Sequence, residues 1–164
     1  LPSEAEWEYA CRAGTATSMN YGAVDADFSR FANLADATLR NFVCHQYFKE
    51  IKLERGTEFD HWIPRIADVE DGGFLSEKPR KYEPNAWGLF DMHGNVSEWT
   101  ASLAKPNPTA DGDAASAEGE RVVRGGSWYD RPINARSEYR TSLRPWQGSF
   151  NVGFRVVCED DLTK

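Results

Sequence analysis

The sequence predicts a mixed α+β domain with little regular secondary structure, built from about two helices and short antiparallel strands. Three observations indicate this class. The first residues carry the signals of a short helix, two apolar segments near the C-terminus are typical of strands, and the stretches between them combine Gly, Pro, Asn and Asp with scattered aromatic residues. With 164 residues, 40% of them hydrophobic, the chain has the length of one domain with a sizeable core, and two packed domains are not expected.

The first predicted element is a short helix over residues 3–13. Ser3 and Glu6 have the spacing of a capping box, in which each side chain accepts a hydrogen bond from the other residue's backbone N–H, and Gly14 is a typical residue at a helix end. Apolar residues at helical spacing give this helix one face that is expected to pack on the core. These residues are Trp7, Ala10 and Cys11.

The next segments are predicted to form a loop, a second helix and another loop. Residues 15–36 are rich in turn-forming and aromatic residues, which favours a loop. Apolar residues between positions 41 and 55 recur at roughly helical spacing and Gly56 follows as a stop signal, so this range predicts the second helix. Residues 68–73 form a short acidic stretch that is expected to be a loop.

Two longer stretches are predicted to be irregular. In residues 85–100 aromatic side chains alternate with Asp, Asn, Glu and Gly too closely for a plain helix or strand, which indicates a structured loop that holds a ligand. Residues 104–120 have few large apolar residues and several Pro and Gly, which predicts a mobile surface excursion.

Residues 121–124 and 152–158 are predicted to form two strands that pair with each other. The second strand has four residues on one face, namely Val152, Phe154, Val156 and Cys158. Between the strands, residues 129–150 are rich in Arg, Tyr, Trp, Asn and Pro with few aliphatic residues, a composition that favours an exposed binding loop. Four aromatic residues are expected in the core rather than at a binding surface: Trp7, Trp87, Trp99 and Phe154.

Composition and missing motifs exclude several functions. The chain has 19 Lys and Arg against 26 Asp and Glu, a net charge of −7, and no basic block indicates nucleic acid or an anionic membrane surface as partner. No apolar run approaches the roughly 18 residues of a membrane span, and the first residues do not have the pattern of a signal peptide. The motifs of zinc hydrolases, P-loops, dinucleotide folds and nucleophile elbows are also missing.

The cysteines and the polar residues near the motifs favour structural roles. Three cysteines, Cys11, Cys44 and Cys158, are too few and too widely spaced for a disulfide scaffold or a zinc site, so buried thiols are favoured over one disulfide that closes a loop. The compartment stays open, with a preference for an exported protein. His93 is expected to bond the backbone of its loop, whereas Arg140 and Arg155 suit either a clamp for a ligand carboxylate or an internal ion pair.

Residues 91–98 have the oxygen-rich chemistry that calcium requires. Asp91 and Glu98 can supply carboxylate oxygens, Gly94 and Val96 can supply carbonyls, and Asn95 suits either coordination or a hydrogen bond within the loop. The spacing is not that of an EF-hand, and acid-and-glycine loops without a metal are common, so both interpretations stay open on chemistry alone. A second, weaker oxygen-rich set combines Asn33 with residues 71–73.

Four ordered motifs closely resemble the formylglycine-generating enzyme family, also called sulfatase-modifying factors. They are LPSEAEWEYACRAG at residues 1–14, NAWGLFDMHGNVSEW at 85–99, RVVRGGSW at 121–128 and NVGFR at 151–155. The resemblance implies a C-type-lectin-like fold for residues 1–164 as a single domain. It also implies that Leu1 corresponds to a point inside the family's domain, so that the domain's N-terminal part is expected on a preceding segment or a separate chain.

The resemblance implies two calcium ions, each held by four residues. One set is the Asn33 side chain, the Leu34 carbonyl, the Asp71 side chain and the Gly73 carbonyl. The other set is the Asp91 side chain, the Gly94 and Val96 carbonyls and the Glu98 side chain. Calcium, as one or two ions, is therefore the expected cofactor.

The family's oxidase chemistry does not carry over to this sequence. Its enzymes use two cysteines that bind copper(I) shortly after the Arg-Gly-Gly-Ser motif, and Asp130 falls where the first of them stands. The sequence has no cysteine between Ser127 and Val157, and a carboxylate is a hard oxygen ligand that does not replace a soft thiolate. No catalytic residue is therefore assigned, and no copper is expected.

The favoured function is a binding or accessory module for a protein, peptide or glycan, without oxidase activity. Variable proteins of diversity-generating retroelements resemble this end of the chain and use the corresponding segment as a binding face. The residues expected to form it are Ser127, Trp128, Tyr129, Asp130, Arg131, Asn134, Glu138, Arg140, Trp146 and Gln147. The alternative is an oxidoreductase of the sulfatase-maturation or sulfoxide-synthase type, with its missing catalytic elements supplied by another chain or domain.

Overall fold

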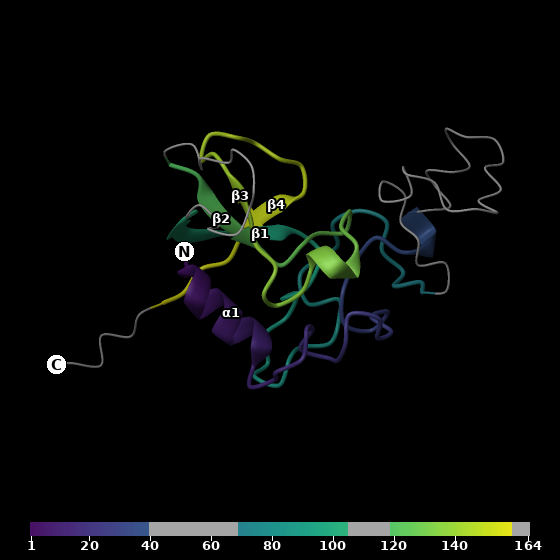
Figure 1. Ribbon diagram of the computed structural model, residues 1–164. Helices are drawn as coiled ribbons and strands as arrows, with labels where there is room; N and C mark the ends of the chain where they lie inside the picture. The colour runs from purple at the N-terminus through teal and green to yellow at the C-terminus, as the bar shows by residue number, and fades with distance from the viewer. Residues whose placement is uncertain (40–68, 105–118, 159–164) are drawn as a thin grey trace, which may run out of the picture.

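The computed structural model describes residues 1–39, 69–104 and 119–158. Its elements in chain order are helix α1 (Glu4–Arg12), strands β1 (Ser97–Leu103) and β2 (Arg121–Arg124), the short 3-10 helix η1 (Pro132–Asn134), and strands β3 (Thr141–Leu143) and β4 (Val152–Phe154). The helix predicted over residues 41–55 and most of the excursion predicted over 104–120 lie outside the described residues. The mixed α+β class with a high share of loop is confirmed for the described part of the chain (Figure 1).

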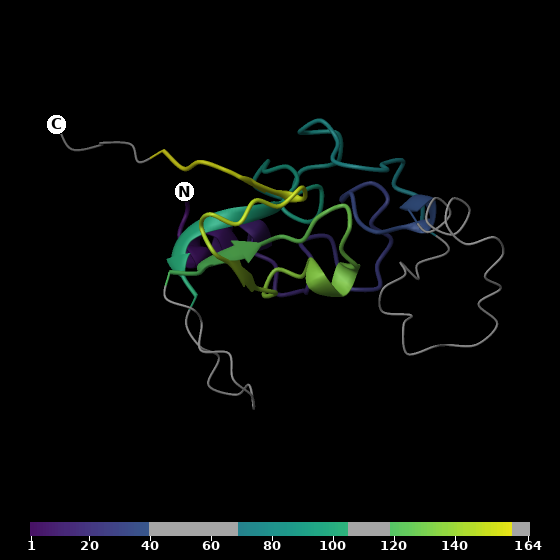
Figure 2. The same cartoon turned by 90° about the horizontal axis from the view of Figure 1, so that it is seen from above.

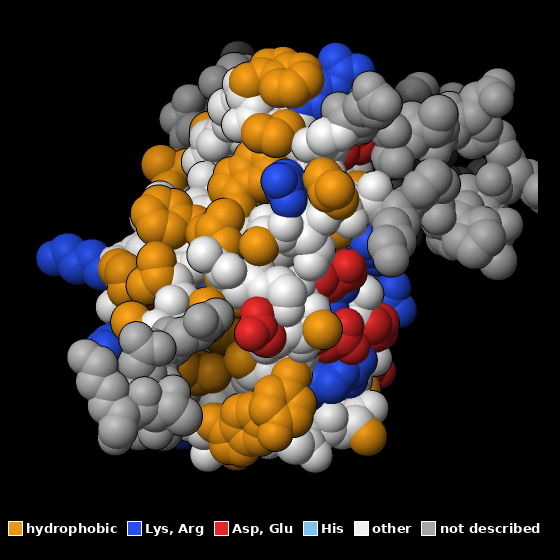
Figure 3. Space-filling view, turned by 90° about the vertical axis from the view of Figure 1, so that its left-hand side faces the viewer, with side chains coloured by type: hydrophobic (Ala, Val, Ile, Leu, Met, Phe, Trp, Pro, Cys, Tyr) orange, Lys and Arg blue, Asp and Glu red, His pale blue; other side chains and the backbone are white. Residues whose placement is uncertain are grey.

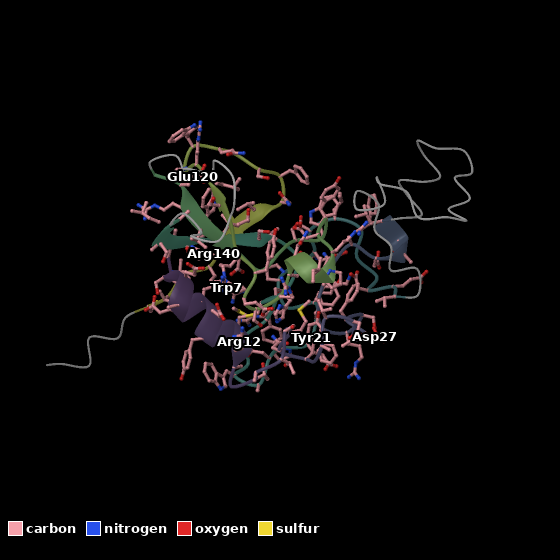
Figure 4. All side chains as sticks on the ribbon, in the orientation of Figure 1. Trp7, Arg12, Tyr21, Asp27, Glu120 and Arg140 are labelled. Atoms are coloured by element: carbon pink, nitrogen blue, oxygen red, sulfur yellow. The ribbon has the colours of Figure 1, made fainter. Side chains whose placement is uncertain are left out.

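Helix α1 forms as its sequence predicts. The Ser3 backbone N–H donates to Glu6 Oε2 at 2.7 Å and the Glu6 N–H donates to Ser3 Oγ at 3.3 Å, so the capping box is complete. The helix ends at Ala13, whose φ of 46° is left-handed. Trp7 and Cys11 are fully buried on the face that meets the sheet, and Figure 4 shows Trp7 pointing from α1 toward the strands.

The sheet corrects the predicted strand pairing. Its order is β3-β2-β1-β4, so the two predicted strands lie on either side of β1 and do not pair with each other. Strand β1 occupies residues that were expected to be loop, beginning at Ser97. It pairs antiparallel with β2 and parallel with β4, which also corrects the expectation of antiparallel strands alone. α1 covers one face of this sheet (Figures 1 and 2).

The C-terminal strand is shorter and more exposed than its alternation predicts. It ends at Phe154, which is 68% exposed, and Val156 and Cys158 beyond it are exposed as well. Because β4 is an edge strand with one neighbour, one side of it is not covered by the described residues. Trp87 is 46% exposed, so only Trp7 of the four aromatic residues expected in the core is fully buried. Figure 3 shows apolar side chains on the surface of the molecule that lies on the left in Figure 1.

Most of the core is built by loops. Its largest cluster joins the loop that follows α1 to the residue after η1. The cluster consists of Met19, Phe28, Ala32, Leu34 and Ala135. The segment 129–150, which was expected to be an exposed loop, therefore contributes buried residues and also contains η1 and β3. In the described part of the chain no helix has the length and apolar character needed to cross a membrane.

A close backbone crossing joins the first loop to the segment before β1. Asn33 and Gly94 form a parallel bridge, and the Asn95 N–H donates to the Asn33 carbonyl at 2.8 Å. Gly94 has a φ of 75°, and a Cβ at this position would lie 2.1 Å from the Asn33 carbonyl oxygen. Only glycine fits this approach, which places the two predicted calcium-binding segments side by side.

Candidate functional site

The first predicted calcium set gathers around the buried carboxylate of Asp71. The Leu34 N–H donates to Asp71 Oδ2 at 2.9 Å and the Gly73 N–H donates to Oδ1 at 2.7 Å. The Tyr82 hydroxyl also donates to Oδ1, at 3.2 Å. The structure therefore brings these segments together, although the contacts that it shows for Leu34 and Gly73 use their N–H groups rather than their carbonyls.

Three oxygens converge on one point in this set. A Cβ built on Gly73 would lie 2.8 Å from Asn33 Oδ1, 2.9 Å from Asp71 Oδ1 and 2.9 Å from the Tyr82 hydroxyl. A side chain at this position would press against the three oxygens, which glycine avoids. Amide, carboxylate and hydroxyl oxygens are hard ligands that suit calcium. The residues present therefore fit a calcium ion, and Tyr82 joins the set without any motif in the sequence to indicate it.

The charge around Asp71 also favours a cation. Asp36 is 1% exposed, and its Oδ2 accepts the Asp71 backbone N–H at 2.9 Å, so two buried acidic residues are neighbours. Burial raises the pKa of Asp71 to about 6, and the Asp36 charge acts in the same direction. A bound cation would offset both effects.

The second predicted calcium set lies along a cavity of about 320 Å³. Asp91, Val96 and Glu98 line this cavity together with Arg155. Asp91 Oδ2 accepts the Arg80 N–H at 2.8 Å, whereas its Oδ1 is buried and has no hydrogen-bond partner among the described residues. Asp91 on its own thus has an oxygen available for a ligand.

Glu98 does not fit a second calcium ion in this arrangement. Arg155 donates from Nε to Glu98 Oε2 at 2.6 Å and from Nη2 to Oε1 at 2.7 Å, and Trp7 Nε1 donates to Oε2 at 2.6 Å. A metal ion here would have to share the carboxylate with the Arg155 guanidinium, whose positive charge repels it. Of the two interpretations of Arg155, the structure thus shows the internal ion pair.

His93 bonds backbone groups, but they belong to two other segments, around Asn20 and Ala135, rather than to its own loop as predicted. Its Nδ1 donates to the Ala135 carbonyl at 2.7 Å and its Nε2 accepts the Asn20 N–H at 3.0 Å, which fixes the neutral tautomer. Burial lowers the pKa of His93 to about 4 and raises the pKa of the neighbouring Cys11 thiol to about 12. The Cys11 sulfur lies 3.5 Å from His93 Nε2, but both groups are neutral and buried. Cys158 is exposed, so the expectation of buried thiols holds for Cys11 and is wrong for Cys158.

A pocket of about 190 Å³ with a mixed polar and apolar lining opens between the sheet and the segment after Ser127. Residues that line it include Arg124, Asp130, Asn134, Tyr139, Ser149 and Asn151. The Ser127 hydroxyl donates to Asp130 Oδ2 at 2.5 Å, and Asn151 Nδ2 donates to Ser127 Oγ at 2.9 Å. Burial raises the pKa of Asp130. This network fixes the Asp130 side chain at the wall of the pocket.

Three aromatic rings form a cluster next to the pocket. Trp128 is nearly buried, whereas Tyr129 and Phe150 are 53% and 74% exposed. The Phe150 ring centroid lies 5.8 Å from that of Trp128 and 6.0 Å from that of Tyr129. Phe150 follows Ser149 and precedes Asn151, both of which line the pocket. We call Trp128, Tyr129 and Phe150 the aromatic cluster; the sequence did not single out Phe150.

The other residues of the predicted binding face are divided between different surroundings. Arg140 pairs with Glu4 of α1 at 2.9 Å and Glu138 pairs with Arg12 at 3.4 Å, so both lie over the helix, and Figure 4 shows Arg140 above α1. Trp146 is 73% exposed, on the loop where the Gln147 N–H donates to the Arg144 carbonyl. Arg131 is the residue that precedes η1. Of the ten predicted residues, Asp130 and Asn134 line the pocket, Ser127 contacts it through Asp130, and Trp128 and Tyr129 belong to the aromatic cluster.

No cluster of three His, Cys, Asp or Glu side chains capable of holding a metal occurs in the described residues. A metal site at Asp71 therefore depends on the amide of Asn33 and on backbone or hydroxyl oxygens. Such a mixed oxygen set is typical of calcium rather than of transition metals.

Known proteins align with nearly the whole chain. The sulfatase-modifying factor enzyme 1-like domain family matches residues 1–160. The formylglycine-generating enzyme of Streptomyces coelicolor is 30% identical over 171 residues, which cover 99% of this chain and 48% of that protein. The inactive C-alpha-formylglycine-generating enzyme 2 of Mus musculus is 30% identical over 163 residues, which cover 96% of this chain and 42% of that protein.

A solved structure shares the fold. PvdO from Pseudomonas aeruginosa is similar with a TM-score of 0.62 at 26% identity, over 94% of this chain and 50% of that chain. The chain thus spans about half the length, or less, of these three proteins.

Proposed function

Because the chain belongs to the sulfatase-modifying factor enzyme 1-like family, we propose that it is a binding or accessory module of that family without cysteine-dependent oxidase activity. The observation that carries the proposal is Asp130. It stands where the resemblance places the first copper-binding cysteine, and it is hydrogen-bonded to Ser127 at the wall of the pocket. Copper(I) requires soft ligands, and this carboxylate does not supply one.

Neither of the two described cysteines lines the pocket. Cys11 is fully buried on the inner face of α1, where its sulfur contacts His93 and Ser137. Cys158 follows β4 on the surface. One relative, from Mus musculus, is itself named an inactive formylglycine-generating enzyme, which supports the loss of oxidase chemistry in a related chain.

The pocket and the aromatic cluster form the proposed binding face. Exposed Tyr and Phe rings supply large contact areas at interfaces, and the neighbouring pocket supplies polar groups that give specificity. A protein, peptide or glycan is the class of partner that such a face fits.

We propose one calcium ion at the set around Asp71. Asn33 and Asp71 would hold it with side-chain oxygens, and the ion would tie residues 33–34 to residues 71–73. This site is connected to the binding face, because the Ala35 N–H donates to the Asp130 carbonyl at 3.0 Å. Calcium would thus stabilise the pocket as well as its own loops. The set around Glu98 stays a prediction from the resemblance.

Metal analysis by mass spectrometry on native protein tests this proposal, together with thermal unfolding with and without EDTA. We expect about one calcium per chain, no stoichiometric copper, and a lower Tm in EDTA that added calcium restores. A cysteine-containing peptide incubated with the copper-treated protein is expected to give no formylglycine. Stoichiometric copper or iron, or turnover of that peptide, would favour the alternative oxidoreductase instead.

A further inference from the structure

The pocket beside the aromatic cluster has a negative charge that its own hydrogen bonds do not neutralise. Both hydrogen bonds that the described residues donate to the Asp130 side chain come from Ser127, whose N–H and hydroxyl reach Oδ2 at 2.9 and 2.5 Å. These donors are neutral, and both are on the same carboxylate oxygen. Asp130 Oδ1 is the oxygen left to accept a hydrogen bond from a ligand.

The basic residue of the pocket, Arg124, already has acidic partners. Its Nη1 lies 3.0 Å from Glu4 Oε1 and its Nη2 lies 2.5 Å from Glu8 Oε2. Glu4 and Glu8 also pair with Arg140 and Arg12, so the charge of Arg124 is balanced within this network. Asp130 forms no ion pair with a basic side chain among the described residues. Tyr139 also lines the pocket. Burial and the negative charge of Asp130 both raise the pKa of its phenol. The electrostatic balance of the pocket favours a cation.

The size of the pocket limits what it holds. At about 190 Å³ it is smaller than the roughly 300–1,000 Å³ of sites that hold a whole small molecule, so one side-chain-sized group fits better. Hydroxyl and amide groups of Asn134, Ser149 and Asn151 line the wall near Asp130. An ammonium has three donors and a guanidinium five, and such a wall offers them acceptors.

The aromatic cluster indicates that the cation belongs to a larger chain. Tyr129 and Phe150 are largely exposed, and Phe150 lies in the chain between the pocket residues Ser149 and Asn151. Their rings can therefore cover the apolar residue that neighbours a basic side chain, or the aliphatic stem of that side chain. A free amine would use the pocket alone and leave these rings in water.

We propose that the pocket binds a Lys or Arg side chain of a polypeptide partner, with the charged end at Asp130 and the neighbouring apolar residue on the aromatic cluster. The inference rests on the binding face proposed above and names its ligand class. Pairing of the two charges is worth about a tenfold difference in affinity or more between a basic side chain and its neutral analogue.

An NMR titration with three probes tests the inference: N-acetyl-Phe-Lys-amide, N-acetyl-Phe-norleucine-amide and n-butylammonium. We expect the lysine peptide to bind at least tenfold more tightly than the norleucine peptide, and more tightly than butylammonium. Raising the salt from 50 to 500 mM is expected to reduce this preference in the unmodified protein, since screening weakens the pairing. This arm does not depend on the folding of any variant.

Asp130→Asn is expected to remove the preference for lysine, whereas Phe150→Ala is expected to weaken both peptides and leave butylammonium unchanged. Asp27→Asn is the matched control, because Asp27 also accepts a serine N–H, from Ser29 at 2.9 Å, and lies on the loop side of the molecule away from the sheet (Figure 4). It should bind all probes like the unmodified protein.

The outcomes separate the two proposals. If the two peptides bind equally and Phe150→Ala weakens both, the binding face stays in place and the cation inference is overturned. Butylammonium that binds as well as the lysine peptide would overturn the polypeptide part of it. No response at the pocket or the aromatic cluster to any probe would count against the binding face and the cation inference together.

Discussion

Arg155 holds the Glu98 carboxylate with two parallel N–H groups, and this pair joins the segment after β4 to the start of β1. The Glu98 side chain is 7% exposed and that of Arg155 is 24% exposed. Removing one partner leaves the other charge buried, so Arg155→Met is expected to cost about 3 kcal/mol of unfolding free energy, measured by urea denaturation. Arg155→Lys is expected to recover only part of the loss, because lysine cannot make the bidentate contact.

The exposed pair of Arg30 and Glu83 is the control for this measurement. Their side chains are 73% and 45% exposed, so Arg30→Ala is expected to change stability by about 0.5 kcal/mol or less. Similar small effects at Arg155 and Arg30 would show that the Glu98 pair does not stabilise the sheet.

Gly94→Ala is expected to destabilise the protein by about 4 kcal/mol or more. The new Cβ would lie 2.1 Å from the Asn33 carbonyl oxygen, so the backbone crossing has to open. Gly14→Ala is the matched control, since Gly14 also has a positive φ, 89°, but has nothing within 4 Å of a Cβ. The left-handed backbone conformation alone is expected to lower the unfolding free energy of Gly14→Ala by about 1–2 kcal/mol. Equal losses in thermal unfolding would mean that strain, not the crossing, determines the effect at Gly94.

Asp71→Asn is expected to abolish the calcium-dependent rise in Tm. The variant keeps a side-chain oxygen but removes the charge on which the convergent oxygens depend. At a calcium concentration 100 times the Kd, the unmodified protein should gain about 2.7 kcal/mol over its metal-free form. Asp91→Asn tests the second set and is expected to leave the calcium response in place. Loss of the response in Asp91→Asn but not in Asp71→Asn would assign the ion to the other set.

Stability is expected to fall in acid because His93 is buried in its neutral form. Its pKa is about 4 in the folded protein and about 6.5 when unfolded, so its contribution is complete above pH 6.5 and is lost as the pH falls toward 4. The full loss corresponds to about 3 kcal/mol. Asp71 acts in the opposite direction, since its raised folded pKa of about 6 makes the metal-free protein lose stability as the pH rises through 4 to 6.

The difference between the unmodified protein and His93→Gln isolates the histidine, because Asp71 is common to both. In urea denaturation at a series of pH values, the unfolding free energy of the variant should lack the slope between pH 4 and 6.5 that uptake of one proton on unfolding produces. Parallel stability curves for the two proteins over this range would contradict the assignment.

The two described cysteines are expected to differ in reactivity. In a Cys44→Ser background, a thiol reagent such as DTNB at pH 8 should modify exposed Cys158 within minutes. Cys11 is 0% exposed and burial raises its pKa to about 12, so it should react only when the protein unfolds. Rapid modification of two thiols in folded protein would show that the Cys11, His93 and Ser137 cluster opens readily.

Local signals predicted α1 because everything that defines it lies within a few residues. The capping box of Ser3 and Glu6 and the apolar spacing of Trp7 and Cys11 are both readable in sequence and both present in the structure. Strand β1 could not be predicted in the same way. In the described part of the chain, the side chain of its buried Glu98 is bonded by Trp7 and Arg155, which lie 91 and 57 residues away. No neighbouring residue signals this, so the polar composition favoured a loop.

The candidate site was predictable by residue type but not by arrangement. The sequence indicated Asp71 and Asn33 as oxygen ligands, whereas Tyr82 and Phe150 join their sites through tertiary contacts that no local pattern records. The predicted binding face separated into parts because η1 turns the chain between Asp130 and Arg140. Which side chains then face the pocket depends on that backbone path.

The distance along the chain between α1 and its partners has a consequence during synthesis. Trp7 bonds Glu98, and Glu4 bonds Arg124, across 91 and 120 residues. At roughly 5–20 residues per second, a ribosome needs about 5–20 seconds to go from one residue of the first pair to the other. During that time the apolar side of the helix is exposed on the nascent chain, where it can bind chaperones or non-native partners. Slow codons before position 98 would lengthen this interval and lower the yield of folded protein.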